Sequence, residues 1–239
     1  SELVLDKMIK AGNSIYLVVT LPDSIKSRGN KKSPTPIKAF CESKNINFKV
    51  NMPNKDEINN INPDVIVVAS YGKIIPEYIL NSSKYGAINL HPSLLPKYRG
   101  PSPVQTAIIN NEKISGTSII LLNETIDGGP IICQEKYKIK PEETYSEIIE
   151  RLFLIGAESI NKVLTNTDLI TKARPQNEEE ATHTKKMEKI EVTKFFESIN
   201  YNWKNDFDVI KEIALITKTR VDENNDSLIK TQTKEKLKK

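Results

Sequence analysis

The sequence predicts an α/β fold with a mostly parallel sheet, and two observations support that prediction. Short apolar runs rich in β-branched residues, such as 15–20 (IYLVVT) and 64–70 (DVIVVAS), are typical of strands covered on both faces. Between these runs lie stretches with helical spacing of apolar residues, and such alternation is the pattern of βαβ units. Ligands of such sheets bind at the carboxyl ends of the strands.

The elements follow one another along the chain. Apolar residues at Leu3, Leu5, Met8 and Ile9 predict a first helix that ends at Gly12-Asn13. Asn62-Pro63 is a turn signal that separates the strand at 64–70 from what precedes it. The other predicted elements are a helix at 36–44, strands at 87–91, 117–123 and 130–139, and helices at 144–163 and 207–215.

Polarity divides the chain into three parts. Residues 1–172 carry the alternating pattern and are predicted to form one domain. Residues 173–192, with an EEE run and THTKKMEK, have the composition of a linker. Residues 193–239 are expected to form only a short, partial C-terminal region, because they are polar and contain no convincing series of strands.

Composition excludes several classes of protein. Of 239 residues 38% are hydrophobic, with a mean hydropathy of −0.43, and the net charge of 35 − 31 = +4 is too small for a general nucleic-acid binder. The longest apolar runs are too short to span a membrane. Cys41 and Cys133 fit neither a disulfide framework nor a zinc site, and no metal site is expected. We expect a cytoplasmic monomer, with an organelle left open.

One stretch carries the residues of a candidate catalytic site. Asn89 and His91 lie two residues apart at the end of the strand predicted at 87–91, so their side chains share one face. Asp127 follows the strand predicted at 117–123, and Gly128-Gly129 allows a tight turn there. A parallel sheet would bring both strand ends together. An amide, an imidazole and a carboxylate around one pocket suit acyl transfer.

The segments NLHPSLLPKYRG (89–100) and IDGGPI (126–131) resemble the signature of the folate-dependent formyltransferases. Segments 27–38, 99–108 and 181–189 resemble the members that act on methionyl-tRNA. The resemblance covers about residues 3–189 and implies a Rossmann-like domain. It also implies formyl transfer from 10-formyltetrahydrofolate to initiator methionyl-tRNA. The implied catalytic residues are Asn89, His91 and Asp127.

The resemblance also implies a folate site. In the family, the stretch that matches Ser93, Leu94, Leu95 and Pro96 lines the tetrahydrofolate site, and the loop that matches Tyr71-Gly72 borders the pocket. Each element has a simpler interpretation. The 93–96 stretch could cap the next segment and pack its leucines, 127–129 could be an ordinary turn, and Tyr71-Gly72 a plain strand end.

A basic loop is the candidate tRNA contact. Residues 22–38 hold five cations against Asp23, a net charge of 5 − 1 = +4 that equals the excess of the whole chain. Most lysine-rich loops are simply solvated. Contact with tRNA phosphates is the alternative, and the resemblance of SRGNKK favours it, with Arg28, Lys31 and Lys32 as the contacting residues.

Two departures from the family pattern lead to expectations of their own. The family opens with a buried strand and a Gly-Thr loop ahead of the helix that matches residues 3–9, so we expect an unfilled interior position in the sheet. It also continues past the linker into a small β-barrel domain, of which 189–203 is a candidate remnant.

Two other functions stay open. One is a formyltransferase for an amino-sugar nucleotide or glycinamide ribonucleotide, against which the basic loop argues, since a small acceptor needs no such arm. The other is a non-catalytic folate- or tRNA-binding relic. A dinucleotide-dependent oxidoreductase is disfavoured, because the sequence contains no G-x-G-x-x-G.

Overall fold

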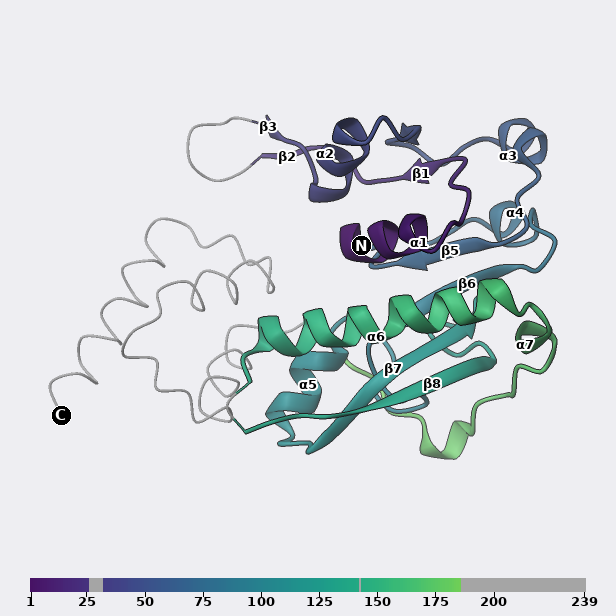
Figure 1. Cartoon of the computed structure of the whole chain (residues 1–239). Coiled ribbons are helices and arrows are strands. Elements are labelled where there is room, and N and C mark those ends of the chain that lie inside the picture. Colours follow the sequence, from purple (N-terminus) through teal and green to yellow (C-terminus); the bar gives the residue numbers. More distant parts are fainter. Residues whose placement is uncertain (26–31, 142, 186–239) are drawn as a thin grey trace, which may run out of the picture.

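The computed structural model describes residues 1–25, 32–141 and 143–185 (Figure 1), and the structural statements below concern these residues. It confirms the α/β class. The helices are α1 (Glu2–Lys10), α2 (Pro36–Ser43), α3 (Lys55–Ile61), α4 (Glu77–Leu80), α5 (Pro103–Ile109), α6 (Tyr145–Thr165) and α7 (Asp168–Thr171), with a 3-10 turn at Glu178–Glu180. The strands are β1 (Val18–Val19), β2 (Ser24–Ile25), β3 (Lys32–Ser33), β4 (Phe48–Lys49), β5 (Ile66–Ala69), β6 (Ala87–His91), β7 (Ile114–Leu121) and β8 (Ile131–Lys138).

The strands form one larger sheet and two small ones. The larger sheet has the order β5-β6-β7-β8, with β5 parallel to β6 and both later pairs antiparallel. Strand β1 pairs in parallel with β4, and β2 pairs with β3 as an antiparallel ribbon. The helix predicted at 207–215 and the region 193–239 lie outside the described residues.

Helix α6 supplies the main cover of the larger sheet (Figure 1). It begins at a capping box in which Thr144 and Glu147 satisfy each other's backbone N–H groups. Helix α1 lies beside α6, and both contribute to one core. That core consists of Val4, Met8, Ile88, Leu90, Ile119, Ala157, Ile160, Val163 and Ile170. Its burial fixes the face of β6 that points away from the candidate site.

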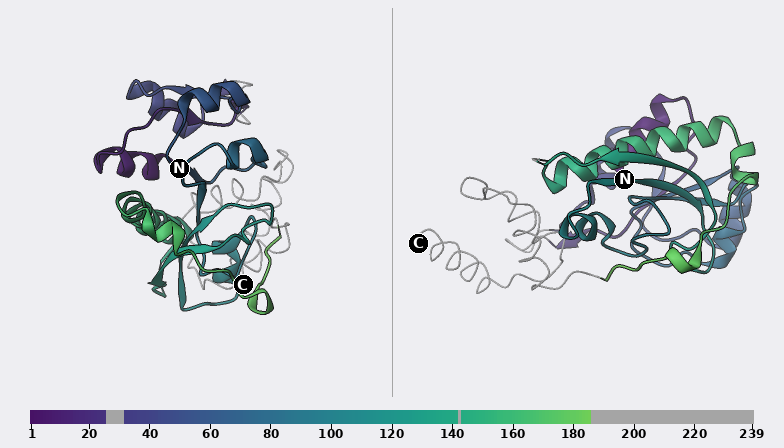
Figure 2. Two further views of the ribbon diagram at one scale, coloured as in Figure 1. Left: turned by 90° about the vertical axis from the view of Figure 1, so that its right-hand side faces the viewer. Right: turned by 90° about the horizontal axis from the view of Figure 1, so that it is seen from below.

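The region around β1 and β5, which we call the front, is packed less completely than the larger sheet. Figure 2 shows the purple and blue elements from β1 to α3 as one group and the teal and green sheet with α6 as another, while α1 packs against α6. A cavity of about 800 Å³ lies between them, lined by apolar residues of α1, β1, α3, β5 and α4. The valines of β1 and all four residues of β5 are only half-buried, so the prediction that 15–20 and 64–70 are fully covered strands was wrong. Their inner edges face this cavity.

Part of the expected linker packs against the domain. The backbone of Arg174 pairs with Ile131 at the start of β8, and that of His183 pairs with Arg99. We call residues 174–184 the strap. Its polar composition led to the linker interpretation, but its backbone groups find partners in the domain instead of solvent. Among the described residues, no helix is long and apolar enough to cross a lipid bilayer.

Candidate active site

Strand β6 sets the direction of Asn89 and His91. Its side chains alternate, so Ile88 and Leu90 enter the core under α6, while Asn89 and His91 point to the opposite face. His91 is 4% exposed although it is polar. Burial of an imidazole in this way requires partners, and they come from two loops.

The loop between β7 and β8 brings Asp127 to this face. Because β7 runs antiparallel to β6, its last residue, Leu121, pairs with Ile88 near the start of β6. The argument that two parallel strand ends meet here was therefore wrong, and residues 122–130 instead fold back over β6. Gly129 makes this possible, since a Cβ there would lie 1.8 Å from the Leu121 carbonyl oxygen.

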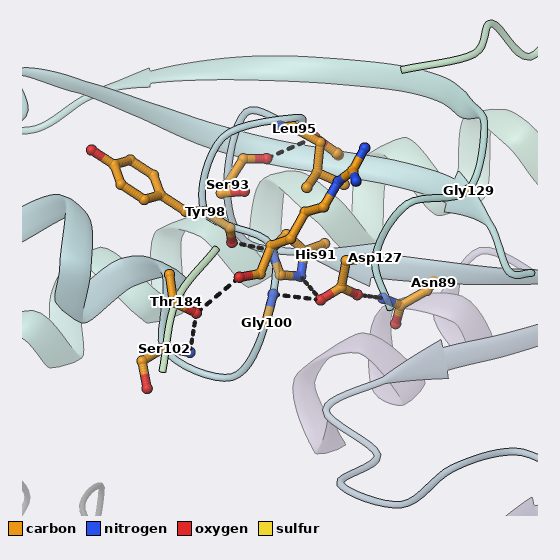
Figure 3. A network of polar contacts seen from close by, with 12 residues as sticks. Asn89, His91, Ser93, Leu95, Tyr98, Gly100, Ser102, Asp127, Gly129 and Thr184 are labelled. Atoms are coloured by element: carbon orange, nitrogen blue, oxygen red, sulfur yellow. Dashed lines mark hydrogen bonds and ion pairs between the residues drawn. The ribbon is translucent and has the colours of Figure 1, made fainter. Parts of the chain in front are cut away.

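The structure brings the three predicted catalytic residues together (Figure 3). Asn89 Nδ2 donates to Asp127 Oδ1 at 3.4 Å, and His91 Nδ1 lies 3.5 Å from Asp127 Oδ2. The shortest contact of the carboxylate is with the backbone, where Gly100 N–H donates to Oδ2 at 2.8 Å. The two longer contacts leave the amide and the imidazole available to a reacting group.

The orientation of the His91 ring is fixed from the other side. Its Nε2 lies 2.9 Å from the carbonyl oxygen of Tyr98, which can only accept, so Nε2 carries a proton. Nδ1 is thus the nitrogen that faces Asp127. A proton moving between the imidazole and the carboxylate would pass through Nδ1.

The predicted folate residues divide into buried and half-buried positions. Ser93 is 1% exposed and its hydroxyl donates to Lys97 O at 2.7 Å, while Leu95 packs in a small core with Ile120 and Ile131. These contacts match the simpler interpretation of the stretch. Leu94 and Pro96 are half-buried and follow in the same loop, and Leu95–Pro96 is a cis peptide.

Tyr71 lies at the carboxyl end of β5, on the cavity. It lines that cavity together with Ser70, and burial raises the pKa of its phenol. Gly72 is the next residue and is exposed. Because Ala69 of β5 pairs with Leu90 of β6, Tyr71 is at the same sheet edge as His91.

The basic loop is only partly described. Arg28 and Lys31 lie outside the described residues, and Lys32 begins β3, where its backbone pairs with Ile25. Lys38 forms an ion pair with Asp23 at 2.9 Å, and this hydrogen bond raises the pKa of Lys38. The only acidic residue of the 22–38 segment is therefore already matched to one cation.

Residues that the sequence analysis did not select complete the site. Tyr98 and Gly100 supply the backbone groups that hold His91 and Asp127, and Gln176 binds the Asp127 carbonyl. The sequence signal for Tyr98 and Gly100 was the YRG that follows the leucine pair, and no motif pointed to Gln176. No group of three His, Cys, Asp or Glu residues within the described part of the chain could hold a metal ion.

Comparison with known families identifies the class of this fold and site. The family model described as formyl transferase matches residues 2–164, and the chain therefore belongs to that family. Among curated relatives, methionyl-tRNA formyltransferase of Thermotoga neapolitana is 42% identical over 166 residues, which are 67% of this chain and 53% of the relative. Methionyl-tRNA formyltransferase of Dictyoglomus thermophilum is 38% identical over 84% of this chain and 65% of its own length. The chain thus spans about half to two thirds of these relatives.

Solved structures show the same fold at lower identity. A sugar 3N-formyltransferase crystallised with dTDP and 5-N-formyl-THF has a TM-score of 0.57 at 19% identity, covering 84% of this chain and 75% of its own. Phosphoribosylglycinamide formyltransferase from Bacillus halodurans has a TM-score of 0.55 at 23% identity, covering 70% and 90%. At these identities the likeness concerns the fold alone.

Proposed function

We propose that this chain transfers a formyl group from 10-formyltetrahydrofolate to the amino group of initiator methionyl-tRNA. The observation that carries the proposal is the contact of Asn89, His91 and Asp127 on one face of β6. Membership of the formyl transferase family and the names of the curated relatives support the donor and the acceptor.

The site residues have distinct roles in the proposed reaction. The neutral amine attacks the formyl carbon, which forms the new C–N bond and places negative charge on the formyl oxygen. Asn89 Nδ2 donates to that oxygen, and His91 donates to it from a protonated Nδ1, because its Nε2–H is already bonded to Tyr98 O. Each such donor contributes roughly 3 kcal/mol to lowering the barrier. Asp127 takes the proton that the amine loses, and the bond from the formyl carbon to N10 then breaks as N10 gains a proton.

The first experiment tests whether Asp127 is a catalytic residue or only part of an ordinary turn. Asp127→Asn keeps the side-chain shape but cannot take a proton, so turnover should fall on the order of 100- to 10,000-fold while folate binding persists. Glu124→Gln is the matched control, because Glu124 is an exposed acid of the same loop. Formylation rates and folate titrations are measured for both variants. A near-normal rate for Asp127→Asn would return Asp127 to the turn interpretation.

The acceptor is tested by competition among amines. Transfer of labelled formyl to charged initiator tRNA is compared with transfer to glycinamide ribonucleotide and to an amino-sugar nucleotide. We expect methionyl-tRNA to be the preferred acceptor. Preference for a small amine would favour one of the other formyltransferases, and folate binding without any transfer would indicate a binding relic.

We propose that the basic loop binds tRNA phosphates. Replacing Arg28 and Lys31 by Ala should reduce the slope of log affinity against log salt by roughly 1–2 units, because each lost phosphate contact removes about one released counterion. Folate affinity should stay unchanged. The control replaces exposed Lys44 and Lys55 by Ala, which removes the same charge elsewhere. An equal slope in both double variants would contradict the proposed contact.

A further inference from the structure

A buried arginine lies behind the candidate site without facing it. Arg99 is 1% exposed, and burying a guanidinium is costly unless its donors are satisfied. Its Nη1 and Nη2 donate to the two carboxylate oxygens of Glu178 at 2.9 and 2.7 Å. Its Nε and Nη2 donate to Gln176 Oε1 at 3.0 and 2.8 Å. Both partners belong to the strap, so Arg99 ties the strap to the domain.

The bond from Arg99 determines how the Gln176 amide is used. Since Oε1 accepts from the guanidinium, the Nε2 group points the other way, toward the loop that carries Asp127. It donates to Asp127 O at 2.7 Å and to Gly129 O at 2.8 Å. Asp127 has a φ of 51°, in the left-handed region that is strained for a non-glycine residue. Gln176 thus holds a strained turn whose side chain is the predicted acid–base group.

The strap also holds the loop on the other side of the site. Arg99 N–H donates to Thr182 O at 2.8 Å, and Thr184 Oγ1 donates to Arg99 O at 3.0 Å. These bonds fix the segment whose Gly100 N–H binds the Asp127 carboxylate. Gly100 has a φ of 102°, and a Cβ there would lie 2.8 Å from Thr184 O, so only glycine fits between strap and carboxylate.

We propose that the strap positions the Asp127 carboxylate, with Arg99 and Gln176 as positioning residues. The Gln176 amide binds the loop that carries Asp127, and the Arg99 guanidinium holds that amide in its orientation. Their effect reaches the reacting groups only through Asp127 and Gly100. The strap thereby holds the Asp127 carboxylate within contact distance of Asn89 and His91. The consequence for rate rests on the proposed formyl transfer, whereas the consequence for geometry does not.

The test uses the full chain with Gln176→Leu, a half-buried position where a similar volume is kept and both carbonyl bonds are lost. The backbone amide signal of Gly100 in ¹H–¹⁵N NMR reports its bond to the carboxylate. We expect this signal to move upfield and the amide to exchange at least about tenfold faster. In the formylation assay we expect kcat to fall by about 10- to 100-fold with KM for the folate donor little changed, because the carboxylate is displaced and not removed.

Three further variants keep the test independent of the folding of any one of them. Glu178→Gln weakens the hold on Arg99, whereas Glu179→Gln changes the neighbouring exposed acid, which is not among the hydrogen-bond and ion-pair partners of the Arg99 side chain. We expect the Gly100 signal to move with the first and not with the second. Arg99→Lys keeps the charge but loses the planar fork, and should behave like Gln176→Leu if it folds.

The outcomes separate the two proposals. A folded Gln176→Leu variant with an unmoved Gly100 signal would overturn the positioning role, whatever its turnover. A lowered melting temperature with unchanged kcat would also overturn it, since the strap would then serve stability alone. If the parent chain transfers no formyl group while the Gly100 signal responds as expected, the proposed function fails and the positioning of Asp127 stands.

Discussion

The larger sheet and the β1–β4 pair are built from similar apolar residues but are packed to different degrees. Ile88, Ile119 and Ile120 are at most 1% exposed, whereas Val18 and Val19 are half-buried and Tyr16 is 68% exposed. Strands β6 and β7 each have a neighbour on both sides, but β1 pairs only with β4. Of these two regions, the more deeply buried strands are those that have a neighbouring strand along each edge.

The unpaired edges meet at the cavity. Val18 N–H donates to Asn47 O and Thr20 N–H to Lys49 O, so the peptide groups of Val19 between them face the other way. On the opposite side, Ile66 N–H donates to Gly86 O, which turns the groups of Val67 toward β1. The candidate site lies on β6, which is paired along both edges, whereas the weakly packed region begins at the open edge of β5.

The largest effect is expected from a strand supplied to this cavity. A β-branched segment joined to Ser1, which lines the cavity, through a Gly-containing loop would pair both open edges. Each buried backbone group without a partner costs roughly 1–3 kcal/mol, so several new pairs should add about 5 kcal/mol. At about 2–4 °C per kcal/mol for a chain of this size, the melting temperature should rise by roughly 10–20 °C.

The control segment carries proline at alternate positions and cannot complete the hydrogen-bond ladder. Equal melting temperatures for the two fusions would show that the cavity does not accept a strand. A sharp cooperative melt of residues 1–239 alone, together with full formyl transfer, would show that the open edges are harmless.

The same comparison can be made with one substitution in each region. Ile119→Ala in β7 removes a side chain that is 1% exposed in the core under α6, and should cost about 4 kcal/mol. Ile66→Ala in β5 removes a half-buried side chain that already borders the cavity, and should cost about 1–2 kcal/mol. Urea denaturation measures both free energies of unfolding. Equal losses of unfolding free energy would mean that side chains beside the cavity contribute as much to stability as those in the core under α6.

Local patterns were sufficient to predict most elements of the larger sheet. The strand predicted at 87–91 is β6 without change, and 117–123, 130–139 and 144–163 correspond to β7, β8 and α6 within a few residues. The strands are marked by short apolar runs, and α6 has a long helical pattern that begins at a Thr–Glu capping box. The α/β class follows from them.

Local patterns could not predict the direction of a strand or the contacts between segments far apart in the sequence. The apolar run of β7 is the same whichever way the strand points, so its antiparallel pairing and the fold-back of Asp127 could not be foreseen. The strap was missed for a related reason. Its residues are polar because their partners are a buried guanidinium and backbone groups, and Arg99 and Gln176 stand 77 residues apart. Composition alone assigns such a segment to solvent.

The smallest expected effect concerns the outer edge of the well-packed region, at Tyr137 of β8. Burial and the hydrogen bond to the Glu143 carboxylate raise the pKa of its phenol from 10.0 to about 12. The unfolded chain therefore loses this proton first, so the contribution of Tyr137 to stability is complete below pH 10 and is lost between pH 10 and 12.

Tyr137→Phe removes the titrating group and its hydrogen bond while keeping the ring in place. At pH 9 the parent chain should be more stable than this variant by about 1 kcal/mol, the usual net value of one hydrogen bond. At pH 11 that advantage should shrink, because the unfolded parent gains from ionising its phenol. Urea midpoints of both proteins at the two pH values measure the change. An advantage of equal size at both would show that the phenol titrates alike in the folded and unfolded chains.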